Sequence, residues 1–202
     1  MKATNLDDEE KKRDLREHFY YEVAMLCFSM TKVMAFKRAK DQSSTNMALE
    51  DFLLHARNLK EFFYYKPHKL YLRAYDFVEN RTKWDRDKPE KTDGIKEVER
   101  RADKELAHLA HGRIYGTPPE KEWDCGTIQK DFLKVVEVFW DHLPEECIGE
   151  RLREAKKMCD QVATSTRKQV GLSTSAGTTT TVSTAMTVDL SSVFFRGKKF
   201  TK

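Results

Sequence analysis

The sequence predicts an all-α protein: a bundle of four to five main helices with a disordered C-terminal tail. In several stretches of helical length, apolar side chains recur at steps of three and four residues. Clusters of Pro, Gly, Ser, Asn and Asp separate these stretches, as is typical of helix ends. Ahead of the tail, no stretch alternates apolar and polar residues for long enough to indicate a strand.

The first two helices are predicted at 6–40 and 47–65. Each carries a single apolar stripe, which in the first consists of Leu15, Phe19, Val23, Leu26, Met30 and Val33. Pro67 ends the second helix, because proline has no amide hydrogen to donate. We expect 70–78 to be a short helix, and 84–94, which is rich in charge and contains Pro89, to be an exposed loop.

Three further helices complete the prediction. One spans 94–115, with Ile95, Val98, Ala102, Leu106 and Leu109 facing inward. The next begins at Thr127, which is a favourable N-cap residue. The last begins at Pro144, because proline is tolerated in the first turn of a helix.

The end of the chain differs in composition from the rest. Between 164 and 187 most residues are Ser or Thr, and a segment with so few large apolar side chains cannot offset its ordering entropy by burial. We therefore expect a helical domain over 1–163 and a disordered tail over 164–202, with a basic and aromatic end.

The formal net charge of +4 is concentrated in this tail. The tail holds six Lys or Arg residues and one Asp, which leaves 31 basic and 32 acidic residues in 1–163. A nearly neutral body does not attract nucleic acid in general, so affinity for RNA would have to arise in the tail or in a local patch.

Several classes of protein are not indicated. The four cysteines are scattered, which predicts free thiols and no metal site. A Gly-rich phosphate loop and other cofactor or hydrolase motifs are absent from the sequence, and we expect no cofactor. The longest apolar run is too short to span a membrane, and the N-terminal residues lack the apolar segment of a secretory signal, so we expect a cytoplasmic protein.

One face of the helix predicted at 94–115 is rich in groups suited to acid–base chemistry. A helical wheel places Arg101, Lys104, His108 and His111 opposite the apolar stripe. Histidine exchanges protons near neutral pH, and an arginine can stabilise charge that develops on a phosphate. Such a face suits RNA cleavage without a metal, although an ordinary solvated helix surface has the same composition.

The spacing of Arg101 and His108 resembles the HEPN superfamily, whose signature is an Arg followed, after four to six residues, by a His. The resemblance implies a small all-α domain of a bacterial defence or toxin–antitoxin system, acting as a dimeric, metal-independent ribonuclease with Arg101 and His108 as catalytic residues. Ala102 departs from the polar residue usual after this Arg. The stretches FLLHARNLKEFF (52–63) and DKELAHL (103–109) also resemble an uncharacterised group of bacterial helical proteins.

The HARN stretch provides further candidate binding residues. His55 falls at the margin of an apolar face, one turn from Asp51, and a hydrogen bond between them would orient a half-buried imidazole. Alternatively, His55, Arg57 and Asn58 line one cleft with His108. The sequence thus leaves two functions open: a ribonuclease, or a non-catalytic helical scaffold or protein-binding module. RNA, a second copy of the chain or a partner protein are the partners that these functions imply.

Deletion of residues 173–202 is expected to leave the melting temperature nearly unchanged, because this segment contributes few apolar side chains to a core. Thermal unfolding of the full and shortened chains, followed by circular dichroism, checks this. A clear drop in melting temperature would show that the tail packs on the helical domain.

Overall fold

The computed structural model describes residues 8–106 and 122–172, and every regular element in this part of the chain is helical. The prediction of an all-α protein is confirmed for these residues. The number of main helices stays a prediction, because 107–121 and 173–202 lie outside the described residues. None of the described helices is long and apolar enough to cross a membrane.

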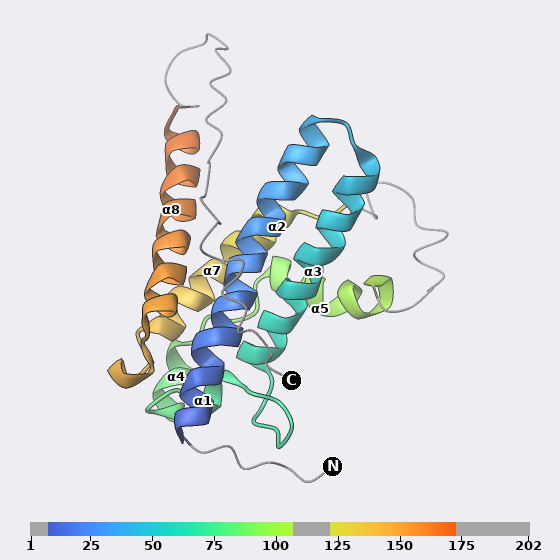
Figure 1. Cartoon of the computed structure of the whole chain (residues 1–202). Helices are drawn as coiled ribbons and strands as arrows, with labels where there is room; N and C mark the ends of the chain where they lie inside the picture. The colour runs from blue at the N-terminus through green and yellow to red at the C-terminus, as the bar shows by residue number, and fades with distance from the viewer. Residues whose placement is uncertain (1–7, 107–121, 173–202) are drawn as a thin grey trace, which may run out of the picture.

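The N-terminal half forms a helical hairpin. Helix α1 (Asp8–Asp14), a π-helical turn (Leu15–Phe19) and α2 (Tyr20–Arg38) follow one another without a break, as the sequence predicted. Helix α3 (Gln42–Tyr64) returns alongside α2 (Figure 1). It begins earlier than expected because the Asp41 carboxylate accepts a hydrogen bond from the Ser44 backbone N–H at 3.1 Å.

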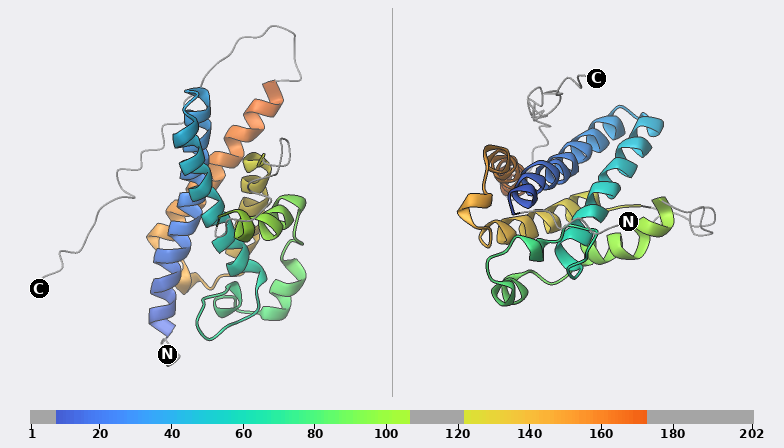
Figure 2. Two further views of the ribbon diagram at one scale, coloured as in Figure 1. Left: turned by 90° about the vertical axis from the view of Figure 1, so that its right-hand side faces the viewer. Right: turned by 60° about the horizontal axis from the view of Figure 1, so that its bottom comes forward.

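Helix α7 (Cys125–Trp140) lies behind this hairpin and contacts every other long helix that the structure describes (Figures 1 and 2). Helix α5 (Asp93–Leu106) packs on the α3 side, and α8 (Glu150–Leu172) packs on the α2 side. Gly94 permits the close approach of α5, since a Cβ there would stand 2.8 Å from the Asp131 carboxylate. The apolar face of α7 is thereby buried along its whole length.

An aromatic cluster forms the centre of the core. The fully buried Phe139 ring of α7 lies with its centroid 5.2 to 5.6 Å from four other aromatic rings, each in edge-to-face geometry. These rings belong to Phe19, Phe62, Phe63 and Trp84. The cluster therefore joins the π-helical turn, the end of α3 and helix α4 (Arg81–Asp87) to α7.

Two predictions for the middle of the chain are wrong. The stretch 70–78 is irregular apart from a 3₁₀ turn at Ala74–Asp76. The expected loop at 84–94 begins inside α4, which the Asn80 side chain caps. The indole of Trp84 explains this helix, because it inserts into the aromatic cluster and is completely buried. The charged neighbours of Trp84 concealed this anchor.

The starts of the last two helices also differ from the prediction. Asp124, not Thr127, caps α7, and its carboxylate accepts the Thr127 backbone N–H at 2.9 Å. Pro144 precedes a 3₁₀ turn at Glu145–Cys147, and α8 starts only at Glu150. Helix α8 continues to Leu172, so the segment expected to be disordered from 164 is helical in its first residues.

Substitution Phe139→Ala is expected to destabilise the protein by about 3–5 kcal/mol, because it removes the ring on which four other aromatic rings converge. Urea unfolding provides the measurement. The exposed neighbour Glu137→Ala is the control and should change stability by less than about 0.5 kcal/mol. Equal losses in the two variants would contradict a core centred on Phe139.

Candidate functional site

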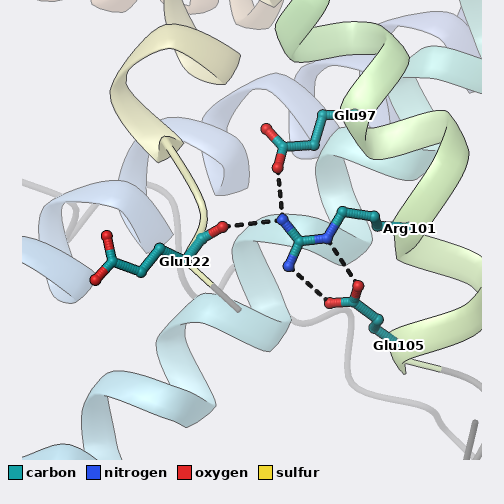
Figure 3. A network of polar contacts seen from close by, with 4 residues as sticks. All are labelled: Glu97, Arg101, Glu105 and Glu122. Atoms are coloured by element: carbon teal, nitrogen blue, oxygen red, sulfur yellow. Dashed lines mark hydrogen bonds and ion pairs between the residues drawn. The ribbon is translucent and has the colours of Figure 1, made fainter. Parts of the chain in front are cut away.

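Arg101, the first of the predicted catalytic residues, is almost completely buried near the end of α5, with 5% of its surface exposed. Its Nε and Nη2 donate to the two carboxylate oxygens of Glu105 at 2.7 and 3.0 Å. Its Nη1 donates to Glu97 at 2.5 Å and to the Glu122 backbone carbonyl at 2.9 Å (Figure 3). The guanidinium also stacks on Trp123, 3.9 Å from the ring centroid.

These contacts hold the guanidinium in a fixed place and in its charged state. Burial acts to lower the pKa of Arg101, but the hydrogen bonds to Glu105 and Glu97 outweigh it and keep the pKa above its ordinary value. The four hydrogen bonds leave a single guanidinium N–H, on Nη2, without a partner among the described residues. The network also ties the end of α5 to the segment that leads into α7.

The placement of Arg101 differs from the expectation that it lies on an open, solvated face. On the wheel of α5, Arg101 comes three residues after Val98 and therefore lies at the margin of the apolar stripe, not opposite it. Glu122 and Trp123 come from a segment distant in sequence and cover this side. Burial of an arginine here is tolerated because Glu97 and Glu105 lie one turn to either side of it.

The remaining residues of this predicted face are only partly described. Lys104 is exposed near the end of α5. His108 and His111 lie outside the described residues. The pairing of Arg101 with His108 as catalytic groups therefore stays a prediction.

The HARN stretch lies on α3, where it faces α2. The His55 ring is buried, with its Nδ1 2.8 Å from the Glu22 carboxylate and its Nε2 3.4 Å from that of Asp51. Asn58 donates to the same Glu22 oxygen at 3.1 Å. Ser29 of α2 donates to Asp51. The expected approach of His55 to Asp51 is thus present, but the shorter contact is to Glu22.

Glu22 could not be predicted, because it lies on another helix and 33 residues away from His55. Because a carboxylate oxygen only accepts, the Nδ1 of His55 donates to Glu22, which is its nearest carboxylate at 2.8 Å. Arg57 points elsewhere and forms an ion pair with Glu61 at 3.3 Å. The structure therefore brings His55 and Asn58 together on Glu22 but does not add Arg57 to this group. A cleft shared with His108 is outside the described residues.

Two buried cations were not predicted as site residues. Lys60, on α3, is 1% exposed and Arg73, after α3, is 7% exposed. On α3, Lys60 lies beside the apolar stripe. A lysine at the edge of such a stripe is ordinarily expected to reach solvent with its ammonium group. The nearby tyrosines were the only signal in the sequence, since aromatic rings often cover buried cations.

The cysteines provide no reactive group. All four are free thiols, as predicted. Burial raises the pKa of Cys125 to about 11, and a hydrogen bond with Cys27, together with burial, raises the pKa of Cys159. Such thiols stay protonated and are poor nucleophiles and metal ligands. The described residues contain no group of three or more side chains arranged to hold a metal ion.

No protein-family model, curated protein or solved structure matches this chain. A functional interpretation consequently rests on the chemistry of the described residues, and the resemblance to the HEPN superfamily stays a prediction.

Substitution Arg101→Gln is expected to cost about 2–4 kcal/mol of stability, because it leaves two carboxylates and a carbonyl without their buried cation. Urea unfolding again gives the measurement. The adjacent Arg100 is exposed and makes a matched control, for which Arg100→Gln should change stability by less than about 0.5 kcal/mol. If Arg101→Gln were equally harmless, the network of Figure 3 would not hold α5 to α7.

Proposed function

We propose that this chain is a non-catalytic binding module built on a bundle of four to five main helices. The observation that carries the proposal is the state of Arg101, whose charge is already taken up by Glu97 and Glu105. The residue predicted to be catalytic is used to hold the fold together.

A phosphate cannot readily take the place of these partners. To stabilise charge on a reacting phosphate, a guanidinium must donate to the phosphate oxygens. Arg101 would first have to give up charge-assisted hydrogen bonds that contribute about 1.5–3 kcal/mol each. Two carboxylates surround one guanidinium, so the remaining local charge is negative and repels an incoming phosphate.

The second group of predicted site residues supports the same proposal. His55 and Asn58 both contact Glu22 and so connect α3 to α2. The imidazole is only 4% exposed, which leaves little access for a substrate that must exchange a proton with it. In this arrangement His55 stabilises the helical hairpin, and the hairpin positions the surfaces that bind partners.

The competing hypothesis is a metal-independent ribonuclease of the HEPN type, with His108 and Arg101 as its catalytic pair. It requires Arg101 to leave both carboxylates when RNA binds. The two hypotheses differ in a single observable, the cleavage of RNA in the presence of a chelator.

We expect single-stranded RNA incubated with the purified chain and EDTA to remain intact over hours, as judged on a denaturing gel, because no described group is placed to activate the 2′-hydroxyl and stabilise the phosphate together. A His108→Ala variant of equal melting temperature serves as the control for a contaminating nuclease. Cleavage by the wild type that disappears in His108→Ala would overturn the proposal in favour of the ribonuclease.

A further inference from the structure

Lys60 is a buried cation without an anionic partner. Its Nζ donates to the neutral hydroxyl of Tyr65 at 3.1 Å and lies 4.8 Å from the centroid of the same ring. In the described part of the chain, Lys60 has no carboxylate within ion-pair distance. Burial of a charge is costly unless an opposite charge compensates it, and a tyrosine ring and hydroxyl compensate only in part.

Arg73 lies on the same tyrosine ring and is similarly short of partners. Its guanidinium is 5.4 Å from the Tyr65 centroid and 5.2 Å from that of Tyr71. Its Nη2 approaches the Glu61 carboxylate only to 3.7 Å, and Glu61 also pairs with Arg57. The buried Nε of Arg73 has no hydrogen-bond partner among the residues described. Two buried cations thus converge on Tyr65, and the only carboxylate within ion-pair distance of either of them among the described residues is Glu61, which Arg73 shares with Arg57.

The loop that contains Arg73 and follows Lys60 is also rich in cations and aromatic rings. It spans 65–73 and lies at the same end of the molecule as α4 (Figures 1 and 2). Lys66 and Lys69 are exposed on it. Its exposed large apolar side chains are Tyr65, Leu70 and Tyr71, the last with 57% of its surface open. Exposed rings stand here beside cations whose charge is only partly compensated, a combination that a purely structural loop does not need.

The loop is also preorganised. His68 accepts a hydrogen bond from the Leu70 backbone N–H at 3.2 Å and stacks on Tyr71 with ring centroids 5.0 Å apart. The Asp76 carboxylate accepts the Arg73 backbone N–H at 2.9 Å. These contacts fix the turn and hold Tyr71 beside the Arg73 guanidinium, so binding of a ligand requires little further ordering of the loop.

The ligand that matches both features has phosphate groups and flat rings close together. A guanidinium with an open N–H is well suited to a phosphate oxygen, and exposed tyrosines provide contact surface for bases. Single-stranded nucleic acid combines the two, and sequence-tolerant binders of this class use a basic surface with interleaved aromatic side chains. An acidic peptide would match the cations alone and would leave the exposed rings unused.

We propose that Lys60, Arg73 and the loop 65–73 form a binding site for single-stranded nucleic acid, with phosphate groups against the cations and bases against Tyr65 and Tyr71. This inference rests on the proposed function as a binding module and names its partner. The rings of Tyr65 and Tyr71 lie on these cations, and both are exposed, so approach of a phosphate requires the two side chains to shift.

The first test uses surface lysines, so that folding is not at issue. Binding of a fluorescein-labelled oligouridine of roughly 12 nucleotides, a length within the usual site sizes, is measured by anisotropy with the full chain. We expect Lys66→Gln with Lys69→Gln to weaken binding about tenfold and to lower the slope of log K against log salt by about 0.7 for each phosphate that is no longer neutralised. The matched control, Lys130→Gln with Lys134→Gln on the exposed side of α7, should bind as the wild type does.

The second test separates the site from the stability of the fold. Lys60→Met removes a buried charge and shortens the unbranched side chain by only one atom, so its melting temperature should equal or exceed that of the wild type. We expect its affinity for the oligouridine to fall about tenfold or more all the same, as we do for Arg73→Gln. A lysine retained only for stability would give the opposite result, a lower melting temperature with unchanged binding.

Three outcomes would overturn the inference: no binding by the wild type, equal weakening in the α7 control, or complete competition by polyglutamate at equal charge, which would identify an acidic protein partner. Each of these leaves the proposed function standing. Cleavage of the bound oligouridine in EDTA would instead overturn the proposed function, even if the site binds as expected. The same samples, run on a denaturing gel, distinguish the two failures.

Discussion

The rest of the structure depends on the packing of aromatic rings around Phe139. Because the rings that meet there come from four separate elements, the cluster fixes the relative positions of the π-helical turn, α3, α4 and α7. Phe62 and Phe63 anchor the last turns of α3 in this cluster, and Lys60 and Tyr65 flank them in sequence. The apolar centre therefore determines where the polar groups at this end of the helix stand.

A structural feature could be predicted from the sequence when the residues that determine it lie close together in the chain. The periodicity of apolar residues is local, and it predicted α3 and α5 because each of these helices has an apolar face of its own. It also predicted α2, although residues 23–27 of that helix are all buried and its buried side chains are not confined to one face. Helix α4 has one large buried anchor, Trp84, among charged residues, and its burial depends on rings far away in the sequence. Arg101 was misplaced for the same reason, since Trp123 covers it from outside its helix.

The protein buries its cations in two different ways. Arg101 is surrounded by carboxylates from its own helix and by a backbone carbonyl, so its charge is compensated. Lys60 and Arg73 are covered mainly by tyrosine rings, whose quadrupole attracts a cation without cancelling its charge. Compensation suits a group that holds two segments together. Incomplete compensation keeps a positive potential at the surface, as recognition of an anion requires.

This difference also explains why the overall charge gives poor guidance to function. At physiological ionic strength, an exposed charge acts over about 8 Å, so a ligand at the loop 65–73 responds to Lys60, Lys66, Lys69 and Arg73 and not to the nearly neutral sum over the body of the chain. Some of the carboxylates that make the net charge of the body nearly zero form ion pairs away from this loop, as Glu97 and Glu105 do with Arg101. Neutrality of the whole chain therefore coexists with a local excess of positive charge.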